Sequence, residues 1–426
     1  MENPKIRFKG FTKDWEQRKL SEITTMHARI GWQNLRTSEF LDSGDYMLIT
    51  GTDFNDGAIN YSTCHFVERE RYEQDKHIQI KNGSILITKD GTLGKVAYVQ
   101  GLSMPATLNA GVFNVEIKDE TEVNDKYLFQ YLKAPFLMDY VNKKATGGTI
   151  KHLNQNILVD FPVFMPSKAE QEEIGTYFEK LDNLITLHQR KCEQTKNLKK
   201  YMLQKMFPQN GAKVPEIRFY GFTYDWEQRK LGEVLISLQS NTLSRADLSN
   251  ETGIAKNVHY GDVLIKFGDV LDVSREQLPM IKDEKILDKY KASFLQNGDV
   301  IIADTAEDTT VGKCSEIAGL RDEVVLSGLH TIPYRPVEKF ATGYLGYYLN
   351  SSAYHDQLIP LMQGIKVTSI SKSAMQDTDI VYPKSTEEQA MIGRYFQSLD
   401  HLITLHQRKC DELKKMKKYM LQNMFI

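Results

Sequence analysis

Hydrophobic residues recur at alternating steps of four and three in two long stretches, and charged or amide side chains fill the positions between them. This spacing is typical of a helix that pairs with another helix along one seam. We therefore expect long helices over residues 169–207 and 387–426 that pair with each other. The expected seam of the first helix consists of Ile174, Phe178, Leu181, Ile185 and His188, and that of the second consists of Ile392, Phe396, Leu399, Ile403 and His406.

The rest of the chain contains shorter apolar runs bounded by Gly, Asn and Asp, which favour β-strands. We predict strands over residues 46–50, 84–88, 95–99 and 111–117, and again over residues 261–267, 298–303 and 313–317. Aromatic-rich stretches at 125–134 and 341–350 predict short helices. The fold class is therefore α/β (α+β), with two similar mixed α/β domains and a pair of long coiled-coil helices.

The chain also repeats itself. The segment PKIRFKGFTKDWEQRKLSEI, which begins at Pro4, returns at Pro215 as PEIRFYGFTYDWEQRKLGEV, and the helical segment from Glu170 returns from Glu388. Such a repeat predicts a pseudo-twofold molecule whose long helices pair antiparallel and whose repeated surfaces bind a partner twice. We divide the chain into a first domain (1–168), a central helix (169–207), a linker and second domain (208–386) and a C-terminal helix (387–426). The residues between the repeated segments differ, so the two domains should present different surfaces.

Composition narrows the class of protein. The 426 residues, 41% of them hydrophobic, are enough for two cores, and the formal net charge of −2 argues against a polycation. The N-terminus lacks the apolar core of a signal peptide, and no apolar run approaches the roughly 20 residues that cross a membrane. The four cysteines show no CxxC or Cys/His ligand spacing, so we expect a reduced, cytoplasmic protein.

The common catalytic motifs are missing. The sequence has no GxxxxGK[ST] phosphate loop, HExxH, GxSxG or GxGxxG, and no Asn-Pro-Pro-aromatic segment of the kind that holds a flipped adenine in amino-methyltransferases. Asp90 with Glu116 and Lys118 has the spacing of some metal-dependent nucleases, but an alternating strand surface produces Glu-x-Lys often. The second copy has Tyr334 and Arg335 in that area instead of acids. We expect no catalytic residue, metal or cofactor on this chain.

Two residue types on the helix seams admit a functional interpretation. His188 and His406 would suit a metal or pH-sensitive site, but a single His per helix without a nearby second ligand favours a polar residue that fixes the pairing register. Cys192 and Cys410 favour small buried residues over a redox pair.

Polar and cationic loop residues of the two domains suit nucleic acid, because Arg and Lys match guanine or phosphate while Asn and Gln match adenine. For each of them an ordinary solvated turn is the alternative. The candidate DNA-binding residues of the first domain are Arg29, Trp32, Gln33, Asn34, Arg36, Lys89, Thr92, Lys95, Thr149, Lys151 and His152. Those of the second domain are Asn241, Arg245, Lys256, Asn257, His259, Lys313, Lys366 and Thr368.

The paired WEQRKL openings, the Gly-led hairpins and above all the twin closing helices with LITLHQRK resemble the specificity subunit of type I restriction-modification enzymes over essentially the whole chain. The resemblance implies two target recognition domains, each of which reads one half of a bipartite, asymmetric DNA site, joined by conserved helices. It implies that this subunit has no active site, and that two modification (methyltransferase) subunits bind it. S-adenosylmethionine, ATP and Mg²⁺ are then expected on those partners and on restriction subunits.

Two other functions stay in view. A self-contained DNA methyltransferase or nuclease would need the cofactor or metal motifs that the sequence lacks. A structural coiled-coil adaptor would need no DNA contact at all, and two separated protected patches in a DNA footprint would exclude it.

Overall fold

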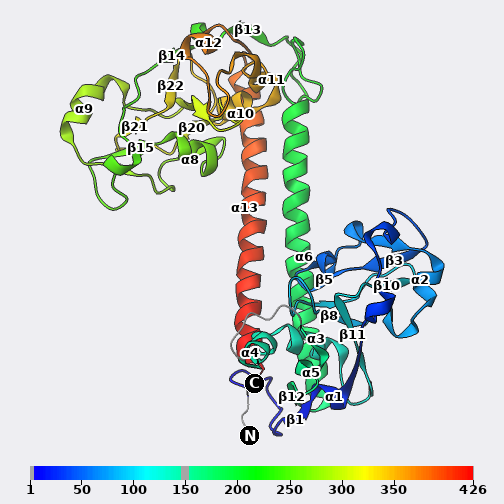
Figure 1. Ribbon diagram of the computed structural model, residues 1–426. Coiled ribbons are helices and arrows are strands. Elements are labelled where there is room, and N and C mark those ends of the chain that lie inside the picture. Colours follow the sequence, from blue (N-terminus) through cyan, green and yellow to red (C-terminus); the bar gives the residue numbers. More distant parts are fainter. Residues whose placement is uncertain (1–3, 145–152, 426) are drawn as a thin grey trace. The chain divides into compact units, whose positions relative to one another are not determined.

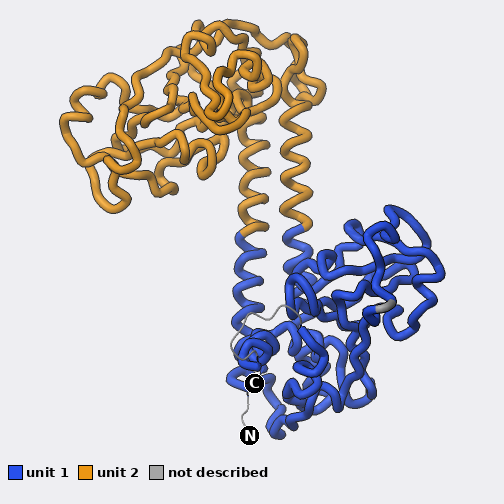
Figure 2. The backbone as a smooth tube through the Cα atoms, viewed as in Figure 1, with its two compact units in different colours: residues 1–189, 408–426 blue, residues 190–407 orange. Residues whose placement is uncertain are grey.

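The computed structural model describes residues 4–144 and 153–425, without the side chain of Trp32. The chain forms two compact units, one of residues 1–189 with 408–426 and the other of residues 190–407 (Figure 2). Each unit therefore contains one mixed α/β domain, the beginning of the long helix that follows that domain, and the end of the other long helix.

The first unit is built on two four-stranded sheets, with strand orders β6-β3-β10-β7 and β2-β11-β8-β9. Its short helices include α3, which packs against β9, and α4, which follows α3 directly (Figure 1). The strands are β1 (Glu16–Lys19), β2 (Thr24–His27), β3 (Tyr46–Ile49), β4 (Phe54–Asn55), β5 (Ala58–Ile59), β6 (His65–Val67), β7 (Gln79–Ile80), β8 (Ile85–Thr88), β9 (Val96–Tyr98), β10 (Ala106–Leu108), β11 (Val112–Ile117) and β12 (Pro162–Met165). The short helices are α1 (Leu20–Ile23), α2 (Arg69–Glu73), α3 (Asp125–Lys133), α4 (Pro135–Lys144) and α5 (Gln155–Leu158).

The second unit has a five-stranded sheet of order β14-β22-β18-β20-β16 and a three-stranded sheet of order β17-β15-β21. Its strands are β13 (Glu227–Lys230), β14 (Leu235–Ser237), β15 (Ala255–Val258), β16 (Val270–Asp272), β17 (Met280–Ile281), β18 (Val300–Ala303), β19 (Thr305–Ala306), β20 (Cys314–Ala318), β21 (Val325–Ser327), β22 (Thr331–Pro336), β23 (Thr368–Ser369) and β24 (Asp379–Tyr382). Its short helices are α7 (Leu231–Val234), α8 (Tyr260–Ile265), α9 (Glu284–Tyr290), α10 (Tyr344–Asn350), α11 (Ser352–His355) and α12 (Lys372–Gln376). The run β14, β22, β18, β20 corresponds to β2, β11, β8, β9 of the first unit, as the repeat predicts.

The two long helices are α6 (Lys168–Lys205) and α13 (Thr386–Asn423), each of 38 residues. They run antiparallel within each unit. In the first unit, Phe178 stacks on Phe425 and Asp182 pairs with Lys417, so residue numbers rise along α6 as they fall along α13. In the second unit, Lys199 pairs with Asp400 and Phe207 stacks on Phe396, which gives the same antiparallel direction.

The repeated opening segments tie each domain to its own long helix. Arg7 holds Glu170 through two parallel hydrogen bonds of 2.7 and 2.8 Å, and Arg218 holds Glu388 in the same way at 2.7 and 2.9 Å. Both carboxylates are buried in the first turn of their helix, where the helix dipole also favours negative charge. The duplicated sequence therefore builds a duplicated framework.

One predicted strand is wrong. The apolar run at residues 261–267 predicts a strand, but these residues form most of α8 and the turn that follows it. The His259 ring accepts a hydrogen bond from the Gly261 amide at the helix start, and Val263 and Phe267, four residues apart, enter the core together while Ile265 lies exposed. An apolar run of this length fits a strand or one helical face equally, and packing decides. Among the described residues, no helix is long and apolar enough to cross a membrane.

Candidate nucleic-acid interface

The structure divides the candidate segment at residues 29–36 into an interior part and a surface part. Arg29 is 2% exposed and donates hydrogen bonds to the Leu108 carbonyl and to Thr107, and burial lowers the pKa of its guanidinium. Gln33 is also buried. Arg29 therefore holds this segment to the domain interior, and the burial of both side chains argues against contacts with DNA. Asn34 and Arg36 are exposed, and Trp32 lies in the 3-10 turn Gly31–Gln33.

The second candidate segment of this domain is the β8–β9 loop. Thr92 is exposed within the loop, and Lys95 is exposed at its base, directly before β9, where the Thr88 amide donates to the Lys95 carbonyl at 2.9 Å. Lys89 is half-buried, with its ammonium 5.5 Å from the centre of the Phe113 ring. The Leu153 amide donates to the Lys89 carbonyl at 2.8 Å, so this loop lies beside the chain that continues from residue 153. Thr149, Lys151 and His152 lie outside the described residues.

The corresponding junction exists in the second unit. The Ile370 amide donates to the Asp304 carbonyl at 2.9 Å, and β19 pairs with β23, so that Thr305 lies opposite Ser369 and Ala306 opposite Thr368. The loop after β18 and the segment that carries Lys366 and Thr368 are thereby joined. Lys366 is exposed and Thr368 is half-buried.

Two asparagines that we proposed for adenine readout are in the interior of the second unit. Asn241 and Asn257 are 1% and 0% exposed, and the Asn241 amide donates to the Asn257 side-chain oxygen at 2.7 Å and to the Ser327 carbonyl at 2.8 Å. They link the segment around Asn241, before the 3-10 turn Arg245–Asp247, to β15 and β21. Their burial argues against base contacts, because both side chains serve the fold.

Arg245 and His259 share one surface of the second unit. The Arg245 guanidinium is exposed and holds Asp262 through hydrogen bonds of 2.5 and 2.8 Å. Burial, with a smaller contribution from Arg245, lowers the pKa of His259, which keeps its ring neutral near pH 7. The ring of Tyr260 contacts both His259 and His330, at centroid distances of 4.7 and 5.3 Å.

That surface continues to the paired strands β19 and β23, because the His330 ring lies 3.5 Å from the carboxylate of Asp304, the residue before β19. The two lysines of this group are partly engaged: Lys256 donates to the Val273 carbonyl and to Glu323, and Lys313 donates to the Leu264 carbonyl. Burial lowers the pKa of Lys313. Arg245, His259 and Lys366 are therefore the side chains of the second domain best placed to meet a ligand.

The expected helix-seam residues of α6 and α13 differ in burial. The structure buries Ile174, Phe178, Leu181, Ile185, Ile392, Phe396 and Leu399, and leaves His188, Ile403 and His406 half-buried. Cys192 and Cys410 are buried too, as small seam residues should be.

Sequence reasoning missed a set of exposed apolar residues beside that seam. Leu184, Leu187, Met416 and Tyr419 form what we term the first helix patch, in the first unit, and Leu198, Tyr201, Leu402 and Leu405 form the second helix patch, in the second unit. All eight are between 41% and 57% exposed. Each residue has its counterpart 218 positions away in the other helix, so the same patch occurs twice. The signal in the sequence was this conservation of apolar residues outside the seam.

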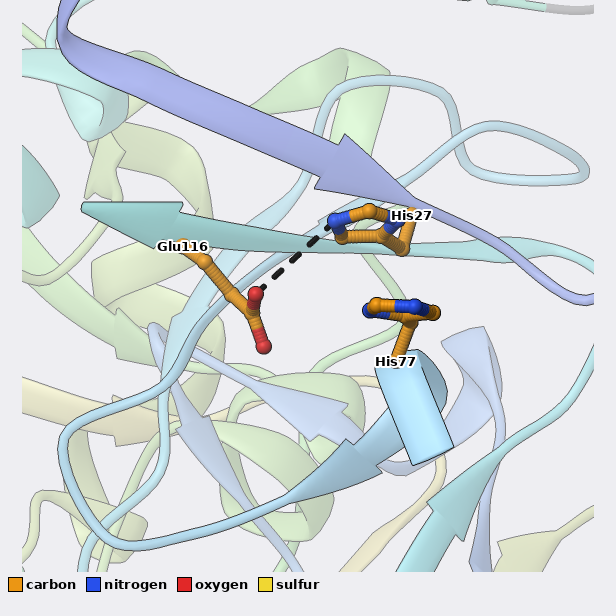
Figure 3. A group of neighbouring side chains, drawn as sticks. All are labelled: His27, His77 and Glu116. Atoms are coloured by element: carbon orange, nitrogen blue, oxygen red, sulfur yellow. Dashed lines mark ion pairs between the residues drawn. The ribbon is translucent and has the colours of Figure 1, made fainter. Parts of the chain in front are cut away.

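Sequence reasoning also missed His27, His77 and Glu116, which come together in the first unit although 50 and 39 residues separate them along the chain (Figure 3). The nuclease-like set does not assemble. Asp90 lies against Gly111, at the beginning of β11, and Glu116 is five residues further along, about 16 Å at the rise of a strand. These two carboxylates cannot share one ion.

Comparison with known proteins identifies the family to which this chain belongs. A family model described as the type I restriction modification DNA specificity domain matches the chain twice, over residues 12–197 and 224–415. The MjaVIII specificity subunit of a type I restriction enzyme from Methanocaldococcus jannaschii is 27% identical over 356 residues, covering 82% of this chain and 79% of the relative. The putative MjaX specificity subunit of the same organism is 24% identical over 426 residues, covering 96% and 92%.

Solved structures agree on the fold. The S subunit of a type I restriction-modification system from M. genitalium covers 100% of this chain with a TM-score of 0.60 and 14% sequence identity, and 99% of its own length is matched. A chain from a study of the assembly of a type I restriction-modification system gives a TM-score of 0.52 at 18% identity, with 97% and 98% covered.

The chain therefore belongs to the family of type I restriction-modification DNA specificity subunits. Its function is that of the subunit that selects the DNA sequence, and it is not itself an enzyme. The mixed α/β fold class with two similar domains and long helices is confirmed. Methyltransferase, nuclease and adaptor functions are not supported.

Proposed function

We propose that each of the two domains reads one half of a bipartite, asymmetric DNA site, and that the paired helices bind two methyltransferase subunits. The observation that carries this proposal is the combination of a duplicated framework with unlike domain surfaces. The ion pairs that anchor each domain, Arg7–Glu170 and Arg218–Glu388, are the same in both copies. The exposed candidate side chains are not.

The surfaces proposed for DNA are the exposed ends of the candidate segments. In the first domain these are Asn34 and Arg36 together with Thr92 and Lys95 at the β8–β9 loop. Arg and Lys provide phosphate contacts that position a duplex, and amide and guanidinium groups match base edges in the major groove. Because the second domain offers a different set, the second half-site should differ in sequence.

Partner binding is proposed at the two helix patches. A soluble monomer rarely exposes neighbouring large apolar side chains without a use for them. Leu184 and Leu402 each precede a seam residue, Ile185 and Ile403, while Met416 and Leu198 precede Lys417 and Lys199, which pair across to the other helix. Leu184 and Met416 therefore flank the seam on the same side of the antiparallel pair, as do Leu198 and Leu402. Two copies of one partner, bound in pseudo-twofold fashion, would cover both patches. We expect these partners to carry S-adenosylmethionine, and restriction subunits to carry ATP and Mg²⁺, in the cytoplasm.

The stoichiometry of the complex tests the docking proposal. Two aspartates placed in the first patch, Leu184→Asp with Leu187→Asp, should remove one methyltransferase subunit of two and leave one bound, as measured by native mass spectrometry. Leu402→Asp with Leu405→Asp should do the same at the other patch, and the four changes together should abolish assembly. The control is Thr186→Asp, an exposed position of the same helix turn on the opposite side of the seam from Leu184. Unchanged two-to-one assembly in the quadruple variant would refute the docking sites.

DNA footprinting tests the reading of two half-sites. The complex assembled from the wild-type chain and its methyltransferase subunits should protect two separated patches with an unprotected or weakly protected spacer. One continuous patch would contradict the assignment of one half-site to each domain.

A further inference from the structure

Three potential metal ligands meet in the first domain, outside every surface assigned above. His27 ends β2, His77 lies in the 3-10 turn Lys76–Ile78, and Glu116 is on β11 (Figure 3). Their ligand atoms all lie within 4.8 Å of one another, and His27 Nε2 is 3.8 Å from Glu116 Oε2. The two imidazole rings are stacked, with centroids 4.5 Å apart and planes 18° from parallel.

Regular structure brings these groups together. The antiparallel register of β2 and β11 sets His27 opposite Asn114 and Thr25 opposite Glu116, which makes His27 and Glu116 diagonal neighbours on one face. The 3-10 turn is fastened to the same place, because the Asn114 amide donates to the His77 carbonyl at 3.0 Å. The cluster therefore rests on sheet register and does not depend on a loose surface loop.

Asn114 connects the turn to the carboxylate. Its amide nitrogen also donates to Glu116 Oε1 at 3.1 Å, which orients that carboxylate towards the imidazoles. Asn114 is 1% exposed, and within the described residues its side-chain oxygen has no hydrogen-bond partner. Glu116 also lines a surface cavity of 840 Å³, so ions reach it from solvent.

The corresponding place in the second domain is occupied by an arginine. There the strand position that corresponds to Glu116 is Arg335, since Ile117 pairs with Thr24 and Pro336 with Leu235 at the corresponding strand ends. The Arg335 guanidinium donates to Asp299 and, at 2.7 Å, to the Phe294 carbonyl, which directly follows the 3-10 turn Lys291–Ser293, the counterpart of Lys76–Ile78. In the second domain, a built-in cation thus holds the turn to the sheet. The first domain has no such built-in cation at this place but a carboxylate and two imidazoles, which together are a donor set for a cation from outside.

We propose that His27, His77 and Glu116 bind one divalent transition-metal ion, with Zn²⁺ as the best match. Two imidazoles and one carboxylate are a donor set for Zn²⁺ and its neighbours and are unsuited to Mg²⁺ or Ca²⁺, which prefer oxygen ligands. Bonds of about 2.0–2.1 Å hold neighbouring ligand atoms roughly 3.3 Å apart, so the ligand atoms must approach one another by about 1.5 Å at most. One of the two stacked imidazoles must also rotate out of the stack, because an ion lies in the plane of each ring that binds it. Water completes the coordination. The ion fixes the 3-10 turn to β2, two residues before the segment that carries the candidate DNA contacts.

Cobalt binding tests the site directly. The metal-free full-length chain, titrated with Co²⁺, should take up one equivalent and develop the visible absorption of a four- or five-coordinate nitrogen and oxygen site, and Zn²⁺ should displace it. His27→Gln with His77→Gln should abolish the band, as should Glu116→Gln. The matched control is His65→Gln, a half-buried histidine of the same domain outside the cluster. Asn114→Ala should weaken Zn²⁺ binding about 10–100-fold, as loss of a carboxylate-orienting neighbour does.

Two outcomes would overturn the proposal. One is the absence of a Co²⁺ band in the wild-type chain. The other is a band that survives in the His27→Gln/His77→Gln variant, which would place the metal elsewhere. Hydrogen exchange gives a second readout that needs no partner or DNA: Zn²⁺ should slow amide exchange at residues 74–80 in the wild-type chain and not in the double variant.

Discussion

Phe425, the penultimate residue of the chain, should be essential for the first unit although that unit consists mostly of residues 1–189. It is 3% exposed and stacks on Phe178 at 5.7 Å, with edge contacts to Tyr127 at 5.5 Å and Tyr131 at 5.3 Å. Phe→Ala changes in such cores cost about 3–5 kcal/mol. For a unit of roughly 200 residues, this corresponds to a decrease in melting temperature of about 10 °C.

Hydrogen-exchange mass spectrometry with thermal unfolding measures this effect by region. Phe425→Ala should reduce protection throughout residues 4–189 and at the end of α13, and leave residues 227–382 unchanged. The matched variant is Phe207→Ala, at the corresponding position just after α6, where the ring stacks on Phe396 at 5.8 Å. It should destabilise the second unit only. Fraying of the last turn of α13 alone in Phe425→Ala, with full protection elsewhere, would refute the idea that each unit is completed by the end of the other helix.

Three further predictions concern charge. Burial raises the pKa of the Glu316 carboxyl from 4.5 to about 7. Between these values the folded chain holds the proton and the unfolded chain does not, so the stability of the second unit should fall by about 3 kcal/mol as pH rises from 4.5 to 7. Urea unfolding at pH 5 and 7.5 should show this decrease, and Glu316→Gln should remove it. Lys199→Met should lower the unfolding free energy of the second unit by about 3 kcal/mol, because Asp269 and Asp400 both lose their cation. Lys417→Met leaves only the half-exposed Asp182 without its cation, and should lower the unfolding free energy of the first unit by about 1 kcal/mol in the same urea assay. Arg36→Ala and Lys95→Ala should each weaken DNA binding by the assembled complex. If the side chain contacts a phosphate, each change should also lower the slope of log affinity against log salt concentration by about one. Unchanged affinity and slope in gel-shift titrations over a range of salt concentrations would contradict the contact.

The sequence predicted the framework well because the framework follows short-range rules. The step pattern through Ile174 and Leu181 marked α6, and the repeat of that pattern marked α13. The Gly-led hairpins gave β8, β9, β18 and β20 within one or two residues. Only the apolar run at 261–267 was misassigned, because its length allows either a strand or one helical face.

The candidate site was predicted less well, because residue type carries no information about burial. Arg29 and Asn257 have the side chains that read bases in DNA-binding proteins, but here they satisfy carbonyl and amide groups in the interior. The contacts that unite His27 with Glu116 depend on strand register, and the duplicated exposed leucines depend on knowing which helix faces pair. These properties follow from tertiary structure and leave no local motif.

Methylome sequencing is the most direct test of the proposed division of labour. Cells that carry this gene with the genes of its methyltransferase partner should show one modified motif with two unlike specific halves and an unspecified spacer, with adenines methylated in both halves. Exchanging residues 227–382 for the corresponding domain of another specificity subunit should change one half of the motif and leave the other half intact. A continuous motif, or a change in both halves after the exchange, would contradict the assignment of one half-site to each domain.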